Sequence, residues 1–169
     1  IYADPPWAWS KTPLVDRGAA RTVEKEYPTL QPHEIAALPV AQLAAENSIL
    51  FLWATGPKLK SALTVMEMWG FTFKTIGFCW IKRTGSGALF WGMGFYTRAN
   101  CELCLIGTKG VGLKRKSATI HQIVEAPISK HSTKPPEIHQ RIERLYDGPY
   151  LELFAREKVP GWVVWGNEI

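Results

Sequence analysis

Near its start the chain carries Asp4-Pro5-Pro6-Trp7, a tetrad whose residue types and order could do chemistry. The Asp4 carboxylate and the Pro5 carbonyl both accept hydrogen bonds, and neither proline has an N–H that would compete for them. Two rigid acceptors beside an aromatic ring suit the exocyclic amine of a purine or pyrimidine. Holding both amine hydrogens would aim the nitrogen lone pair at an electrophile, which favours transfer of an activated methyl group by orientation and electrostatics. The structural alternative is a proline-rich turn with a capping aspartate.

The elements that must position this tetrad are typical of an α/β sheet. Continuous apolar runs predict buried strands, and "PKLKSALTVMEMWG" and "STKPPEIHQRIERLYDG" predict helices, the second capped by Ser132 or Thr133. We expect a mostly parallel central sheet with helices on both faces. Ligands bind outside the carboxyl ends of strands in such sheets, and both the tetrad and the end of "YLELFAR" fall there. The predicted strands cover 1–3, 48–55, 71–82, 101–107, 119–127, 150–156 and 161–168.

Composition indicates an ordinary globular domain. The 169 residues are 46% hydrophobic, so residues 1–169 are expected to form a single domain. The chain begins with Ile1 rather than Met, inside strand-like sequence, so we expect a domain trimmed at its amino terminus. No apolar run is long enough to span a bilayer, and we expect no membrane association.

Three cysteines without framework spacing indicate a reducing compartment, and we expect a cytoplasmic location. Cys101 and Cys104 form a lone CxxC inside an apolar strand-like run, without a second CxxC or a suitably spaced histidine pair. We therefore interpret them as buried strand cysteines and expect no metal.

The net charge of +5 suits a polyanionic partner without requiring one. Residues 8–31 follow neither hydrophobic period and form a long loop, which in a compact domain is usually functional or disordered. Basic residues in the predicted loops are expected to lie next to the tetrad, and some of them to contact phosphates in salt-sensitive binding. Solubility is the alternative role, and for "LKRK" the two roles are equally favoured. These basic residues are Lys11, Arg17, Arg21, Lys25, Arg83, Arg98, Lys109, Lys114, Arg115 and Lys116.

Six segments in order resemble the MT-A70 family of S-adenosylmethionine-dependent adenine-N6 methyltransferases. They are "YADPPW", "EYPTL", "LFLWAT" with "WGF", "ELCLIGTKG", "HSTKPPEIHQRIERL" and "LELFAR" with "GWVVWGNE". The resemblance implies a Rossmann-like methyltransferase fold with permuted motif order, in which the catalytic motif precedes the cofactor-binding segment. It also implies S-adenosyl-L-methionine as cofactor.

The resemblance assigns roles to individual residues. Asp4, Pro5, Pro6 and Trp7 would be catalytic, with Asp4 also close to the cofactor. Substrate binding would fall to Tyr27, Glu102 and Lys134, although a turn tyrosine, a solvated strand glutamate and a surface lysine are the ordinary interpretations of these three. The remaining cofactor-binding residues would be Lys134, Phe154, Arg156, Asn167 and Glu168.

The hypothesis that follows is methyl transfer to the N6 amine of adenine in nucleic acid, in single strands or with the base flipped out of a duplex. DNA is preferred over RNA because the chain resembles short bacterial or phage proteins. An RNA adenosine-N6 methyltransferase and a non-catalytic nucleic-acid-binding homologue are the alternatives. The sequence leaves open whether the chain forms a homodimer or a heterodimer.

Overall fold

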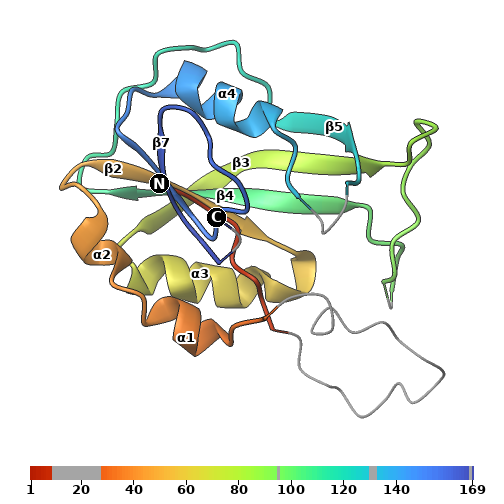
Figure 1. Ribbon diagram of the computed structural model, residues 1–169, viewed down its shortest axis with the longest axis horizontal. Helices are drawn as coiled ribbons and strands as arrows, with labels where there is room; N and C mark the ends of the chain where they lie inside the picture. Colours follow the sequence, from red (N-terminus) through yellow and green to blue (C-terminus); the bar gives the residue numbers. More distant parts are fainter. Residues whose placement is uncertain (9–27, 95, 130–132, 168) are drawn as a thin grey trace.

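The computed structural model describes residues 1–8, 28–94, 96–129, 133–167 and 169, and these residues build one seven-stranded sheet (Figure 1). The strand order is β5-β3-β4-β2-β1-β6-β7. The strands are β1 (Tyr2–Ala3), β2 (Ser48–Ala54), β3 (Thr72–Arg83), β4 (Cys101–Lys109), β5 (Ile123–Pro127), β6 (Tyr150–Leu153) and β7 (Trp162–Trp165).

The sheet is parallel except for β4. This strand pairs antiparallel with β2 on one side and β3 on the other, whereas the other neighbouring strands pair parallel. Because β4 runs backwards, its first residues lie at the edge where the other strands end. The reversal therefore brings Cys101 and Glu102 to the carboxyl edge of the sheet and leaves Lys109 at the opposite edge.

Helices cover both faces of the sheet. One face carries α1 (Pro32–Ala36) and α3 (Leu59–Met68), which follows the 3-10 turn η2 (Gly56–Lys58); α2 (Val40–Leu43) leads into β2. The other face carries α4 (Glu137–Leu145), as Figure 1 shows. Each helix turns its apolar side to the sheet: Ile138, Ile142 and Leu145 of α4 are buried, at the spacing of an amphipathic helix.

The two faces hold separate hydrophobic cores. The α3 side packs Leu50, Leu52, Val65 and Trp69 among others, and the α4 side packs Tyr2, Phe51, Trp53 and Trp80 with the apolar residues of α4. Side chains of β2 point alternately to the two faces of the sheet, and both faces are covered. All seven residues are therefore buried, which explains the continuous apolar sequence of this strand.

The predicted fold class is confirmed, a mostly parallel α/β sheet with helices on both faces. Two local predictions are wrong. The N-cap of α4 is Pro136 and not Ser132 or Thr133, because the helix begins only at Glu137, after the two prolines. Cys104 is buried but Cys101 is exposed, since Cys101 is the first residue of β4 and lies at the edge of the sheet.

Within the described part of the chain, no helix is both long and apolar enough to cross a membrane.

Candidate functional site

The tetrad lies at the carboxyl end of β1, in the middle of the sheet between β2 and β6. Its tryptophan is locked in place: Trp7 is buried, and its indole N–H donates to the Trp53 carbonyl over 3.1 Å. Asp4 remains partly exposed, at 18% of its side-chain surface. A fixed corner thus presents one carboxylate at the mouth of the sheet.

The Pro5 carbonyl differs from the expected open acceptor. It accepts the backbone N–H of Trp7 over 2.9 Å, within the tetrad itself. The prolines themselves have no N–H to donate, but the next residue, Trp7, does, and its N–H competes for this carbonyl. A carbonyl has two lone pairs, so Pro5 keeps capacity for one further hydrogen bond.

Backbone pairing fixes the chain on both sides of residues 9–27. Leu30 donates its N–H to the Pro6 carbonyl over 2.8 Å, and Ala8 donates to the Leu30 carbonyl over 2.9 Å. These bonds form an isolated parallel bridge between Trp7 and Leu30. The bridge holds the tetrad from its carboxyl side, as β1 holds it from its amino side.

Beside the tetrad, four charged side chains form an alternating cluster. Lys134, just before α4, places Nζ 2.7 Å from Asp4 Oδ2 and 3.1 Å from Glu102 Oε2. The other oxygen of Glu102 is paired with Lys82 of β3. Two carboxylates and two ammonium groups therefore sum to zero charge. The hydrogen bond from Lys134 engages the Oδ2 oxygen of Asp4.

Mutual attraction keeps this cluster ionised. Burial alone would raise the pKa of Glu102, but Lys134 and Lys82 outweigh it and the pKa is lowered. Burial alone would lower the pKa of Lys134, but Asp4 and Glu102 outweigh it and the pKa is raised. Both groups are thus charged throughout the neutral pH range.

Each of the two lysines packs its ammonium group against an aromatic ring. Lys134 Nζ lies 5.4 Å from the ring centre of Trp53, and Lys82 Nζ lies 5.0 Å from that of Trp80. Trp53 is itself fixed, because its indole N–H donates to the Tyr2 hydroxyl over 2.9 Å. Packing of the α4-side core therefore sets the positions of the charges above it.

A pocket opens next to Asp4 and Lys134, between β1, β6 and the start of α4. A second, partly buried pair lies in it: His139 Nε2 and Glu152 Oε2 share a 2.7 Å hydrogen bond. Phe154, which follows β6, has φ of 62°, the left-handed region that side chains rarely adopt. The lining residues are Tyr2, Asp4, Thr133, Lys134, Pro136, His139, Glu152, Phe154, Arg156 and Glu157.

The structure brings together most of the residues singled out in the sequence. Asp4, Lys134, Phe154 and Arg156 line one pocket, and Glu102 joins them through Lys134. Glu102 is buried, so the solvated-face interpretation is wrong. Asn167 is exposed and is not among the lining residues. Tyr27 and Glu168 lie outside the described residues.

Three residues of the site have no counterpart among the sequence predictions. Lys82 pairs with Glu102, and His139 and Glu152 pair inside the pocket. The pairing of β3 with β4 explains why Lys82 reaches Glu102. Trp80 lies opposite Glu102, and Lys82 is the next residue of β3 on the same face of the sheet. His139 and Glu152 carry no local pattern that distinguishes them from surface residues.

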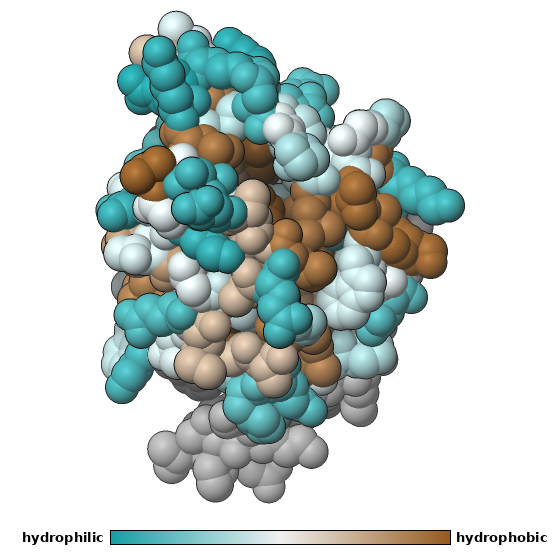
Figure 2. All heavy atoms as spheres, turned by 90° about the vertical axis from the view of Figure 1, so that its left-hand side faces the viewer, coloured by the Kyte–Doolittle hydropathy of each residue, from teal (hydrophilic) through white to brown (hydrophobic). Residues whose placement is uncertain are grey.

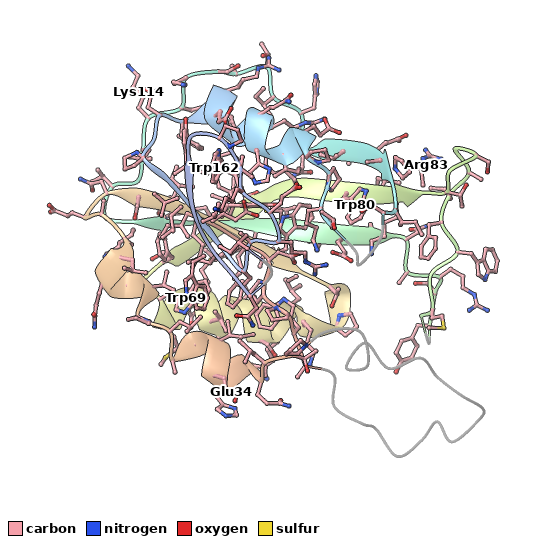
Figure 3. All side chains as sticks on the ribbon, viewed as in Figure 1. Glu34, Trp69, Trp80, Arg83, Lys114 and Trp162 are labelled. Carbon is pink, nitrogen blue, oxygen red and sulfur yellow. The ribbon has the colours of Figure 1, made fainter. Side chains whose placement is uncertain are left out.

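Four of the basic residues lie away from the tetrad, contrary to the expectation. Lys109 ends β4 at the amino-terminal edge of the parallel strands, and Lys114, Arg115 and Lys116 follow it there. Figure 2 looks onto this edge, where hydrophilic side chains stand in separate groups among hydrophobic ones. Lys114 and Arg83 lie at opposite ends of the sheet (Figure 3).

Of the remaining basic residues, Arg83 ends β3 at the carboxyl edge and Arg98 lies in the loop that follows. The positions Lys11, Arg17, Arg21 and Lys25 lie outside the described residues.

Comparison with known proteins gives matches over the whole chain. Residues 1–168 match the MT-A70 family. The chain is 31% identical over 184 residues to the type II methyltransferase M.MunI of a Mycoplasma species, an alignment that covers all of this chain and 76% of that protein. It is 29% identical over 182 residues to human METTL4, named an N(6)-adenine-specific methyltransferase, and covers 37% of it. It is 28% identical over 180 residues to human METTL3, the catalytic subunit of an N(6)-adenosine-methyltransferase, and covers 28% of it. The chain thus spans about a third of the human relatives or less.

Proposed function

Because the chain belongs to the MT-A70 family, we propose that it transfers a methyl group from S-adenosyl-L-methionine to the N6 amine of adenine in nucleic acid. The observation that carries the proposal is Lys134, which joins Asp4 of the tetrad to Glu102 at the mouth of the sheet. Residues 1–169 act in this proposal as one catalytic domain, located in the cytoplasm as its three free thiols favour.

The pocket beside Asp4 suits the proposed cofactor by its donor set. Asp4 and Lys134 offer one negative and one positive group to the zwitterionic amino-acid end. Glu152 offers a carboxylate to ribose hydroxyls, and Phe154 offers a ring to a flat base. When bound, the cofactor supplies a methyl group activated on a sulfonium.

Asp4 and Pro5 hold the target amine in the proposed mechanism. Asp4 Oδ1 and the remaining lone pair of the Pro5 carbonyl would accept the two N–H groups and orient the nitrogen lone pair. The nitrogen loses one proton as it gains the methyl group, and the Asp4 carboxylate would accept that proton and pass it to solvent. Lys134 fixes the Asp4 carboxylate through Oδ2, so the acceptor does not have to reorganise during the reaction. Pro6 and the buried Trp7 shape the slot by fixing the backbone beneath the base.

Further roles rest on the resemblance alone. Tyr27 would approach the adenine, and Asn167 and Glu168 would contact the cofactor ribose. Arg156, which lines the pocket, would flank the cofactor base. These assignments add to the proposal and do not carry it.

The target adenine must leave a base stack to reach Asp4, so single strands or flipped bases are the expected substrates. The preference for DNA rests on similarity to the Mycoplasma type II methyltransferase. Similarity to METTL3 supports RNA as the alternative polymer.

A direct assay tests the proposal. The protein is incubated with S-adenosyl-L-methionine and matched single-stranded DNA, duplex DNA and RNA, and N6-methyladenine is quantified by mass spectrometry after digestion. We expect product on DNA, with a fall of at least about 10²-fold for Asp4→Ala because an orienting acceptor is lost. Circular dichroism of the variant controls for folding.

Undiminished activity in a folded Asp4→Ala protein would sink the mechanism. Cofactor binding without methylation of any of the three polymers would favour the non-catalytic, nucleic-acid-binding alternative.

A further inference from the structure

The loop between β3 and β4, residues 84–100, begins and ends at the ion cluster of the candidate site. Lys82, which pairs with Glu102, donates its backbone N–H to the Asn100 carbonyl over 2.8 Å, and its carbonyl accepts from Phe90 over 2.9 Å. In Figure 1 the loop extends beyond the ends of β3 and β4, away from the sheet. The loop therefore starts from the carboxyl edge of the sheet, the edge that carries Asp4.

Two glycines keep the limbs of the loop in contact. A Cβ on Gly92 would overlap the Ala99 carbonyl, and a Cβ on Gly94 would overlap the Thr97 carbonyl. Only glycine lets the two backbones approach so closely. The loop is therefore a narrow ribbon at this point, and residues on its two limbs become neighbours.

This ribbon exposes large apolar side chains. Trp91 is 73% exposed and Met93 is 86% exposed, and Tyr96 is fully exposed. Arg98 from the opposite limb lies over the Trp91 ring, with 5.1 Å between Cζ and the ring centre. An indole that stays open to solvent while a guanidinium covers one face has its other face available for a flat partner.

The positive charge of the loop favours a polyanionic binding partner. Residues 84–100 contain Arg98 and no aspartate or glutamate. Aromatic rings for stacking beside cations for phosphates are the features by which proteins hold single-stranded nucleic acid. An apolar protein partner would not need the arginine placed on the tryptophan.

We propose that the β3–β4 loop docks the single-stranded stretch of nucleic acid next to the target base, with Trp91 and Arg98 as a stacking platform for a flanking base. Tyr96 supplies a second ring on the same ribbon. This inference rests on the proposed function for its choice of substrate, but it is a binding property that needs no catalysis to be measured.

The test is direct binding of a fluorescently labelled 20-nucleotide single-stranded DNA that contains one adenine, followed by anisotropy. Trp91→Ala is expected to weaken binding roughly 5- to 150-fold, as for loss of one stacking ring, and Trp91→Phe to restore most of it. Tyr96→Ala should weaken binding as well. Val111→Ala, an exposed apolar truncation at the other edge of the sheet, is the matched control and should bind like the parent protein.

Equal affinity of the parent, Trp91→Ala and Tyr96→Ala proteins would overturn the proposal. Sedimentation of the same variants distinguishes a protein interface: if Trp91→Ala dissociates a dimer and leaves DNA affinity unchanged, the loop binds a second copy and the proposal is wrong. If the variants bind DNA weakly but the parent protein methylates nothing, docking stands and the proposed function fails.

Discussion

The two ends of β4 carry the same kinds of charged side chain in opposite circumstances. At its first residues, Glu102 is buried between Lys134 and Lys82, and the side chains of all three are at most 15% exposed. Beyond its last residue, Lys116 pairs with Asp147 in a bridge whose members are 40% and 82% exposed. The end with buried charges faces the tetrad, and the other lies at the far edge of the sheet.

This contrast shows that the density of charge in a sequence does not locate a site. "GLKRK" is the densest basic run of the chain, yet its lysines are solvated and lie away from Asp4. A single lysine, Lys134, has the larger effect, because it is removed from water and held by two carboxylates. Burial with compensation, and not charge alone, distinguishes the candidate site.

The largest difference between the two ends is expected from removing one lysine at each. Lys134→Met leaves two carboxylates without their shared partner and should lower the free energy of unfolding by about 3 kcal/mol. Lys116→Met should leave the urea unfolding midpoint unchanged, because an exposed pair contributes little. Equal effects of the two substitutions in urea titrations would contradict the comparison.

Dependence of stability on pH gives the next largest effect. Glu102 has a lowered pKa, so its contribution is present above its ordinary value near 4.5 and is lost as pH falls through the lowered value. Lys134 has a raised pKa, so its contribution is complete below about 10.5 and is lost as pH rises beyond it.

Glu102→Gln should therefore cost about 2 kcal/mol at pH 7 and flatten the acid side of the stability curve. Unfolding midpoints measured from pH 3 to pH 7 check this. A parent-like acid limb in the variant would show that the pKa of Glu102 is not lowered by folding.

The smallest effect concerns salt dependence of DNA binding. Arg98→Gln removes one cation from the β3–β4 loop at the carboxyl edge and should reduce the slope of log affinity against log salt by about 0.7 for single strands. Lys114→Gln removes an exposed cation at the other edge and should leave the slope unchanged. Binding titrations between about 50 and 200 mM salt measure both slopes. A larger change for Lys114→Gln would reverse the assignment of edges.

Some of the site follows from local sequence. The apolar run before Asp4 predicts a strand end, and strand ends in α/β sheets predict ligand sites, so the place of the tetrad could be predicted from the sequence. The helix containing Ile138 and Ile142 could also be predicted from the sequence, because its apolar residues recur once per helical turn.

The direction of β4 could not be predicted from the sequence in the same way. Apolar content shows that β4 is buried but not which way it runs, and the wrong placement of Lys109, Lys114, Arg115 and Lys116 follows from this. A signal existed: the connection from β3 to β4 contains no helix, whereas parallel neighbours usually need one. The contact of Lys134 with Asp4 spans 130 positions, and only the assembled fold makes it.

The bridge between Trp7 and Leu30 has a consequence for how this protein can change. Its two backbone hydrogen bonds fix the points where the chain leaves the tetrad and returns, whatever number of residues separates them. The entropy of closing a loop grows only slowly with its length, so segments of different length and composition can be exchanged between these anchors at small thermodynamic cost. Evolution or design can therefore exchange the sequence between these anchors as a unit, while the backbone bonds beside the tetrad keep Trp7 and Leu30 paired.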